Sequence, residues 1–149
     1  MSDTALITVA RSDDCLANNA AVPSLMLCSL LLVVVVASLR LCGFARTLRL
    51  IRSMTRGDAV SWNDTGHAFA TATAKRLALV AALYPGRARC LEQSLTLYWL
   101  LRRSAMSVVL RLGVQPTSFA AHAWVEYGGS PILENEMVHT MLPFPGHLV

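Results

Sequence analysis

The chain of 149 residues has few charged side chains, since 15% of its residues are Asp, Glu, Lys or Arg while 54% are apolar. This composition is apolar for a soluble domain and predicts a buried hydrophobic element or a partner. Its four cysteines form no CxxC pair, and its histidines show no HExxH spacing. We therefore expect no metal centre, and reduced thiols in a cytoplasmic protein rather than a disulfide framework.

Charge is also absent from one long stretch, because no charged residue lies between Asp14 and Arg40. The most apolar part, residues 25–39, is shorter than the roughly 20 residues that a membrane span needs. Acidic residues in the first 14 positions argue against a signal peptide. The sequence favours a helix that packs in the protein or rests on a bilayer. Residues 1–19 are polar and irregular, and we expect a loose terminus there.

A second helix is expected over residues 41–52. Leu41, Phe44 or Ala45, Leu48 and Ile51 recur at helical spacing. Arginines occupy the other faces of this segment. They are typical of a solvated face on a core helix, and also of contact with anionic lipid or an acidic partner. Nucleic acid is not expected, because no aromatics lie between the basic residues and no reading motif is present.

The remaining residues, 61–149, contain the candidate catalytic residues. We expect them to form one compact domain together with the hydrophobic and basic region 20–60. Helices are predicted over residues 66–83 and 90–103. Strands are predicted over 107–112, 118–127 and around Ile132, and residues 137–149 are expected to be irregular. Helices followed by an antiparallel sheet indicate an α+β fold.

Cys90 and His122 are the candidate catalytic residues. Cys90 begins the second of these helices, and the N–H groups at a helix start favour a thiolate. His122 lies in the predicted strand 118–127, where it can act as proton partner. An isolated cysteine or histidine is more often structural. Two arginines just before Cys90, Arg87 and Arg89, favour the catalytic interpretation.

A hairpin at Gly128-Gly129 is predicted to bring a third polar residue back toward His122. The length of its loop sets the register. A two-residue loop places Asn135 opposite His122, and the neighbouring registers place Glu134 or Glu136 there. Glu126 shares the face of His122 but is four residues away along the strand, about 13 Å, too far to reach the ring.

These motifs resemble the leader peptidases of lasso-peptide biosynthesis. The likeness rests on Cys90-Leu91, the helix after it, residues 110–114 and the block Ala121-His122-Ala123-Trp124-Val125-Glu126, and it covers roughly residues 68–134. The resemblance implies a transglutaminase-like cysteine protease with a papain-like core, in which the nucleophile helix packs on a small antiparallel sheet. It implies Cys90, His122 and Glu134 as the catalytic set. The family usually has Asp at the third position, so Asn135 stays an alternative.

The resemblance also implies the substrate and the partners. The substrate would be a ribosomal precursor peptide, cut between its leader and its core through a thioester on Cys90. The chain resembles the split form, which works with a separate leader-binding protein and passes its product to an ATP-dependent cyclase. No cofactor is expected, because the sequence has no phosphate-binding loop. Two other functions remain open, a transglutaminase-like acyltransferase and a non-enzymatic membrane adaptor.

Overall fold

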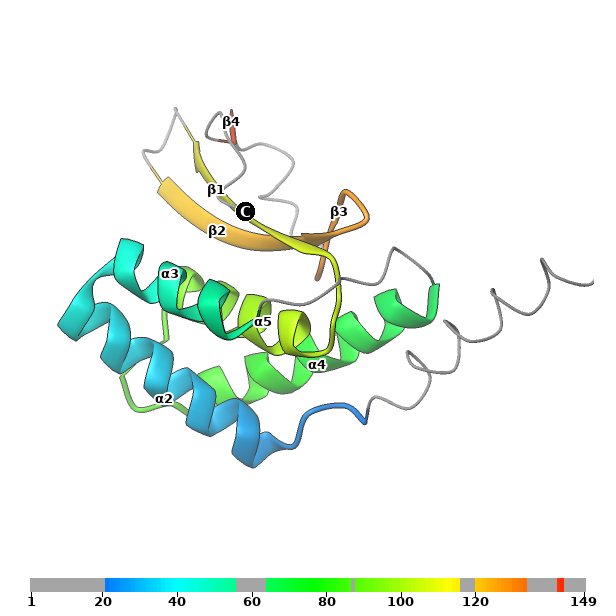
Figure 1. The fold of residues 1–149 in the computed structure, drawn as a ribbon, viewed down its shortest axis with the longest axis horizontal. Helices are drawn as coiled ribbons and strands as arrows, with labels where there is room; N and C mark the ends of the chain where they lie inside the picture. The colour runs from blue at the N-terminus through cyan, green and yellow to red at the C-terminus, as the bar shows by residue number, and fades with distance from the viewer. Residues whose placement is uncertain (1–20, 56–63, 87, 116–119, 134–141, 144–149) are drawn as a thin grey trace, which may run out of the picture.

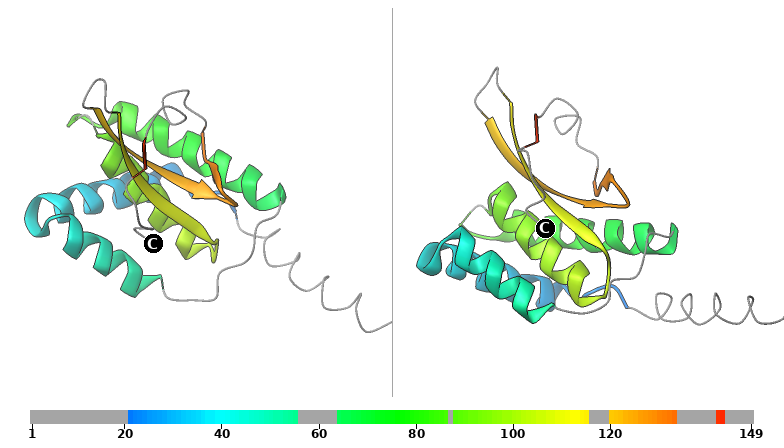
Figure 2. Two further views of the ribbon diagram at one scale, coloured as in Figure 1. Left: turned by 90° about the horizontal axis from the view of Figure 1, so that it is seen from above. Right: turned by 45° about the horizontal axis from the view of Figure 1, so that its top comes forward.

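The computed structural model describes residues 21–55, 64–86, 88–115, 120–133 and 142–143. These residues form the helices α2 (Leu25–Cys42), α3 (Phe44–Met54), α4 (Asp64–Leu83) and α5 (Cys90–Arg103), and the strands β1 (Val108–Gln115), β2 (Ala120–Tyr127), β3 (Ser130–Pro131) and β4 (Leu142–Pro143). The helices lie on one side of the sheet, with α2 beyond α5 (Figure 1). The turned views keep this layering (Figure 2). The α+β prediction is confirmed.

Helix α5 is the centre of the core. All eight residues from Ser94 to Leu101 are buried, as expected for a helix that is enclosed on every side. It packs against α2 and α4 on one side and against β1 and β2 on the other. Tyr98 and Leu95 are among the largest fully buried side chains. Because Cys90 is the first residue of α5, this packing also fixes the candidate nucleophile.

The boundary between the first two helices differs from the prediction. Helix α2 starts at a Ser24 cap, whose side chain accepts a hydrogen bond from the Leu27 N–H at 3.2 Å. It runs on to Cys42 and ends at Gly43, whose φ of 77° is easily adopted only by glycine. Leu41 therefore belongs to α2 and is 83% exposed, so its predicted place on the buried face of the next helix was wrong. Leu48 and Ile51 are buried as predicted.

The sheet has the strand order β3-β2-β1-β4, and every neighbouring pair is antiparallel. Strand β1 reaches Gln115, beyond the predicted end at residue 112. The expectation of an irregular C-terminal stretch was wrong at β4, which pairs with Gly113 and Val114 of β1. Its Pro143 is compatible with this strand because β4 lies at the edge of the sheet, where proline is tolerated. The rest of residues 137–149 lies outside the described part of the chain.

Candidate functional site

Cys90 occupies the first turn of α5. The Glu92 side chain accepts a hydrogen bond from the Arg89 N–H at 2.7 Å, which stabilises the start of the helix. The Cys90 thiol is free and partly buried. The prediction that a helix begins at this cysteine is confirmed. Arg89 is exposed just before it, whereas Arg87 lies outside the described residues.

His122 lies in the middle of β2, where its Cα pairs with that of Gly113 on β1. The side chain is partly buried. Burial lowers the pKa of His122 from its ordinary value of 6.5, because the charged imidazolium loses solvation. The neutral imidazole is therefore favoured near pH 7. A neutral imidazole is the form that can accept a proton from a thiol.

The two candidate residues line the same pocket, which has a volume of about 280 Å³. Its walls come from α4, α5, β2 and the two residues after β3. The lining is Ala74, Leu77, Ala78, Cys90, Gln93, Ser94, Leu97, His122, Ala123, Trp124, Val125, Ile132 and Leu133. This is an apolar pocket with few polar groups, as in ligand sites, and it is at the lower end of their size range, roughly 300 Å³.

Ser94 links the helix of Cys90 to the strand of His122. Its Oγ donates a hydrogen bond of 2.7 Å to the carbonyl oxygen of Ala123, and both residues are buried. Val125 has the same parity as Ala123, and its carbonyl accepts from the Ile132 N–H at 2.9 Å. The two carbonyls thus point toward the same edge of β2. The pairing of β2 with β3 ends before Ala123. The Ala123 carbonyl therefore accepts its hydrogen bond from Ser94 instead of from β3.

Gln93 is the second polar side chain from α5 in the pocket. Its Nε2 donates to the Ala88 carbonyl at 2.8 Å. A primary amide carries two N–H donors, so one remains for another acceptor. Gln93 lies one helical turn after Cys90 and lines the pocket with it.

Trp124 and Glu126 follow His122 on the same face of β2. The rings of His122 and Trp124 stack with centroids 6.4 Å apart and 14° between their planes. Trp124 Nε1 donates to Glu126 Oε1 at 2.9 Å, and Arg111 Nε donates to Glu126 Oε2 at 3.0 Å. Glu126 is therefore occupied by Trp124 and Arg111. This agrees with the expectation that it does not orient the imidazole itself.

Gly113 makes room for this arrangement. A Cβ at this position would lie 2.8 Å from Trp124 Cη2 and 2.9 Å from Cζ3. Such distances are too short for carbon atoms, so a side chain here would displace the indole. The glycine opposite His122 therefore leaves the space that the indole of Trp124 occupies while it stacks on the imidazole.

The third catalytic position stays a prediction. The two glycines of the hairpin have φ values of 60° and 82°, and Tyr127 pairs with Ser130, as expected for a two-residue loop. However, β3 ends at Pro131, and Leu133 has a φ of 60°, which interrupts an extended strand. The register cannot simply be continued to His122. The three candidates, Glu134, Asn135 and Glu136, lie outside the described residues.

The sequence interpretation selected Cys90 and His122, which line one pocket, but it did not select the residues that hold them. Ser94 was detectable as a polar residue one turn beyond Cys90 on an otherwise apolar helix face. Trp124 was detectable from its two-residue spacing to His122. No local pattern indicated that Gly113 lies beneath Trp124, because that contact joins two strands.

One comparison with known proteins gave a match. The model of the transglutaminase-like superfamily matches residues 31–143, which is more than half of the chain. The matched segment contains Cys90, His122 and all the residues that line their pocket. No curated protein and no solved structure matched significantly.

Proposed function

The chain belongs to the transglutaminase-like superfamily, and from this premise we propose that it is a cysteine peptidase that removes the leader of a lasso-peptide precursor. The family membership indicates activity of the cysteine-protease or acyltransferase type. The observation that supports catalysis at Cys90 is its position, at the start of a buried helix and in one pocket with a neutral histidine. The lasso-peptide assignment depends on the likeness of residues 121–126 and of Cys90-Leu91 to those peptidases.

In this proposal His122 acts first as a base. The neutral imidazole takes the proton of the Cys90 thiol, and the resulting thiolate attacks the carbonyl carbon of the scissile peptide bond. The imidazolium then gives the proton to the leaving amine, and the acyl group remains on sulfur as a thioester. Water attacks the thioester while His122 accepts its proton. The carboxylate product leaves, and the thiol is restored.

Two donors are proposed for the oxyanion that forms at each step. One is the backbone N–H of Cys90, since the first N–H groups of a helix have no acceptor within the helix. The other is the amide of Gln93, which lines the same pocket. Glu134 is proposed to orient His122, with Asn135 as the alternative.

The small pocket supports a role for partners. A site of about 280 Å³ holds only the residues near the cut, so most affinity for a leader peptide must come from elsewhere. We assign that binding to a separate leader-binding protein, which would replace a bimolecular encounter with a local one. An ATP-dependent cyclase would receive the freed core peptide. All these steps would take place in the cytoplasm.

Cleavage of a precursor peptide tests this function. The protein is incubated with the precursor, with and without the leader-binding protein, and the products are identified by mass spectrometry. We expect a free carboxylate on the leader and strong stimulation by the partner. Cys90→Ala and His122→Ala should each abolish cleavage. Cleavage at the wild-type rate by Cys90→Ala would contradict the proposal, and a leader joined to an amine would indicate an acyltransferase.

Selective alkylation separates an enzyme from a non-enzymatic adaptor. Cys42 is exposed, whereas Cys28 is fully buried and burial raises the pKa of its thiol. An activated Cys90 should react with iodoacetamide faster than Cys42 does, although Cys90 is less exposed. Mass spectrometry of peptides gives all three rates in one sample. Slower reaction at Cys90 than at Cys42 would favour the adaptor.

A further inference from the structure

Helix α2 is apolar on both of its faces. One face is buried in the core through Cys28, Leu31, Leu32, Val35 and Val36. The other face is exposed over the length of the helix, with Met26 83%, Leu30 61%, Val33 49%, Val34 37% and Leu41 83% exposed. These positions follow helical spacing and form one stripe. A helix that is apolar all round is expected inside a large core or in contact with a membrane.

The exposed surface continues onto the neighbouring helices. An apolar groove of about 230 Å³ joins Leu25 and Val33 of α2 to Leu79 and Leu83 of α4. Leu79 is 53% and Leu83 78% exposed. Contiguous apolar surface of this kind is rare on monomeric soluble proteins and marks an interaction site.

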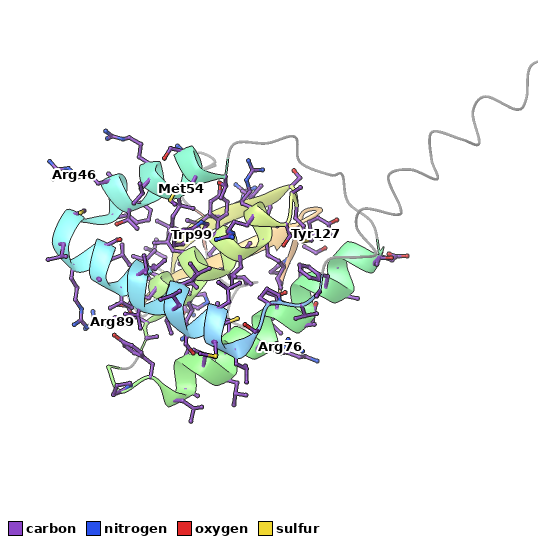
Figure 3. The ribbon with its side chains drawn as sticks, turned by 60° about the horizontal axis from the view of Figure 1, so that its bottom comes forward. Arg46, Met54, Arg76, Arg89, Trp99 and Tyr127 are labelled. Carbon is purple, nitrogen blue, oxygen red and sulfur yellow. The ribbon has the colours of Figure 1, made fainter. Side chains whose placement is uncertain are left out.

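The charged residues of α2 and α3 have one sign. No acidic residue occurs between Asp14 and Asp58, whereas five arginines do. Arg40 is exposed in the last turn of α2, and Arg46 and Arg49 line an open hollow on α3 together with Leu50, which is 50% exposed. Figure 3 shows Arg46 pointing away from the body of the protein at the outer end of α3.

We propose that α2, the exposed side of α4 and the arginines of α3 form a docking surface for an anionic phospholipid bilayer. The five buried residues of α2 argue against a span, because crossing the bilayer would remove them from the core. The helix instead lies in the plane of the interface, with its exposed stripe among the acyl chains. Guanidinium groups bind lipid phosphates well, because they can donate two parallel hydrogen bonds.

This orientation leaves the Cys90 pocket open. The pocket is walled by α4, α5 and β2, and α2 lies on the side of the helical layer away from the sheet (Figure 1). The protein would therefore present its pocket to the solvent while it rests on the membrane. The proposal does not depend on which reaction Cys90 performs.

Vesicle binding by the full-length protein tests the docking surface. Vesicles of phosphatidylcholine alone and of phosphatidylcholine with phosphatidylglycerol are sedimented with the protein. We expect binding to the second kind only, and weaker binding at high salt. The double substitution of Arg46 and Arg49 by Ala should weaken this binding by about 30-fold, because each arginine contributes about fivefold.

A matched pair of substitutions tests the apolar stripe. Leu30→Glu on α2 and Leu142→Glu on β4 change leucines that are both 61% exposed. Only Leu30→Glu should abolish vesicle binding, and circular dichroism should show that both variants are folded. A protein that stays in the supernatant with anionic vesicles would overturn the proposal, as would equal binding by Leu30→Glu. Resistance to extraction at alkaline pH would overturn it in favour of a span. Loss of leader-binding-protein stimulation in Leu30→Glu, without vesicle binding by the wild type, would overturn it in favour of a protein partner.

Discussion

Substitution of Ser94 by Ala should remove a hydrogen bond that joins the helix of Cys90 to the strand of His122. The wild-type serine donates a 2.7 Å hydrogen bond to the Ala123 carbonyl, next to His122, and it is only 8% exposed. Alanine fits the same space but cannot donate. The carbonyl is then left without this donor in a buried site, which costs about 1–3 kcal/mol.

The loss should appear in both stability and activity. For a domain of this size, each kcal/mol lowers the melting temperature by about 2–4 °C. A shift of about 1 Å between Cys90 and His122 can lower the rate of a reaction by about 100-fold. We therefore expect a lower urea midpoint, a lower kcat for precursor cleavage and slower alkylation of Cys90. KM should change little, because Ser94 acts through the positions of Cys90 and His122.

Ser104→Ala is the matched control, at the C-cap of the same helix. Ser104 is partly buried, but its hydroxyl donates to the Leu100 carbonyl of α5 at 3.3 Å. Its removal should change stability by about 0.5 kcal/mol or less and leave Cys90 alkylation unchanged. If Ser94→Ala lowers stability but leaves both cleavage and alkylation at wild-type rates, the bond does not position the site and the reasoning is refuted.

Three further predictions concern the residues around His122. Because burial lowers the pKa of His122, and the neutral base is the active form, the acidic limb of kcat/KM should lie below pH 6.5; a limb above this value would contradict the assignment. Gly113→Ala should destabilise the protein by about 1–3 kcal/mol through overpacking against Trp124 and should lower kcat, both measured beside wild type; an unchanged kcat would show that the indole does not position His122. Among alanine substitutions at Glu134, Asn135 and Glu136, Glu134→Ala should lower kcat most. A larger loss in Asn135→Ala would favour a papain-like amide as the group that orients His122.

Local patterns in the sequence were sufficient for most of the elements. The long apolar run, the helical spacing of Leu48 and Ile51 and the two glycines after Tyr127 each predicted an element that the structure contains. These signals are local, because helix periodicity and turn chemistry depend on neighbours within a few residues. The error at Leu41 arose because this residue also fits the helical spacing of Leu48 and Ile51, and only the backbone shows that α2 continues to Cys42.

The candidate site divides in the same way. Cys90 and His122 could be selected from residue type and local context, because a helix start and a strand are local features. Their meeting in one pocket depends on contacts between residues far apart in the chain, such as Ser94 with Ala123 and Gly113 with Trp124. The sequence likewise did not determine which face of α2 is exposed, because apolar residues occupy both faces. Only the packing of α2 against α4 and α5 decided which face is buried and which is left for a membrane.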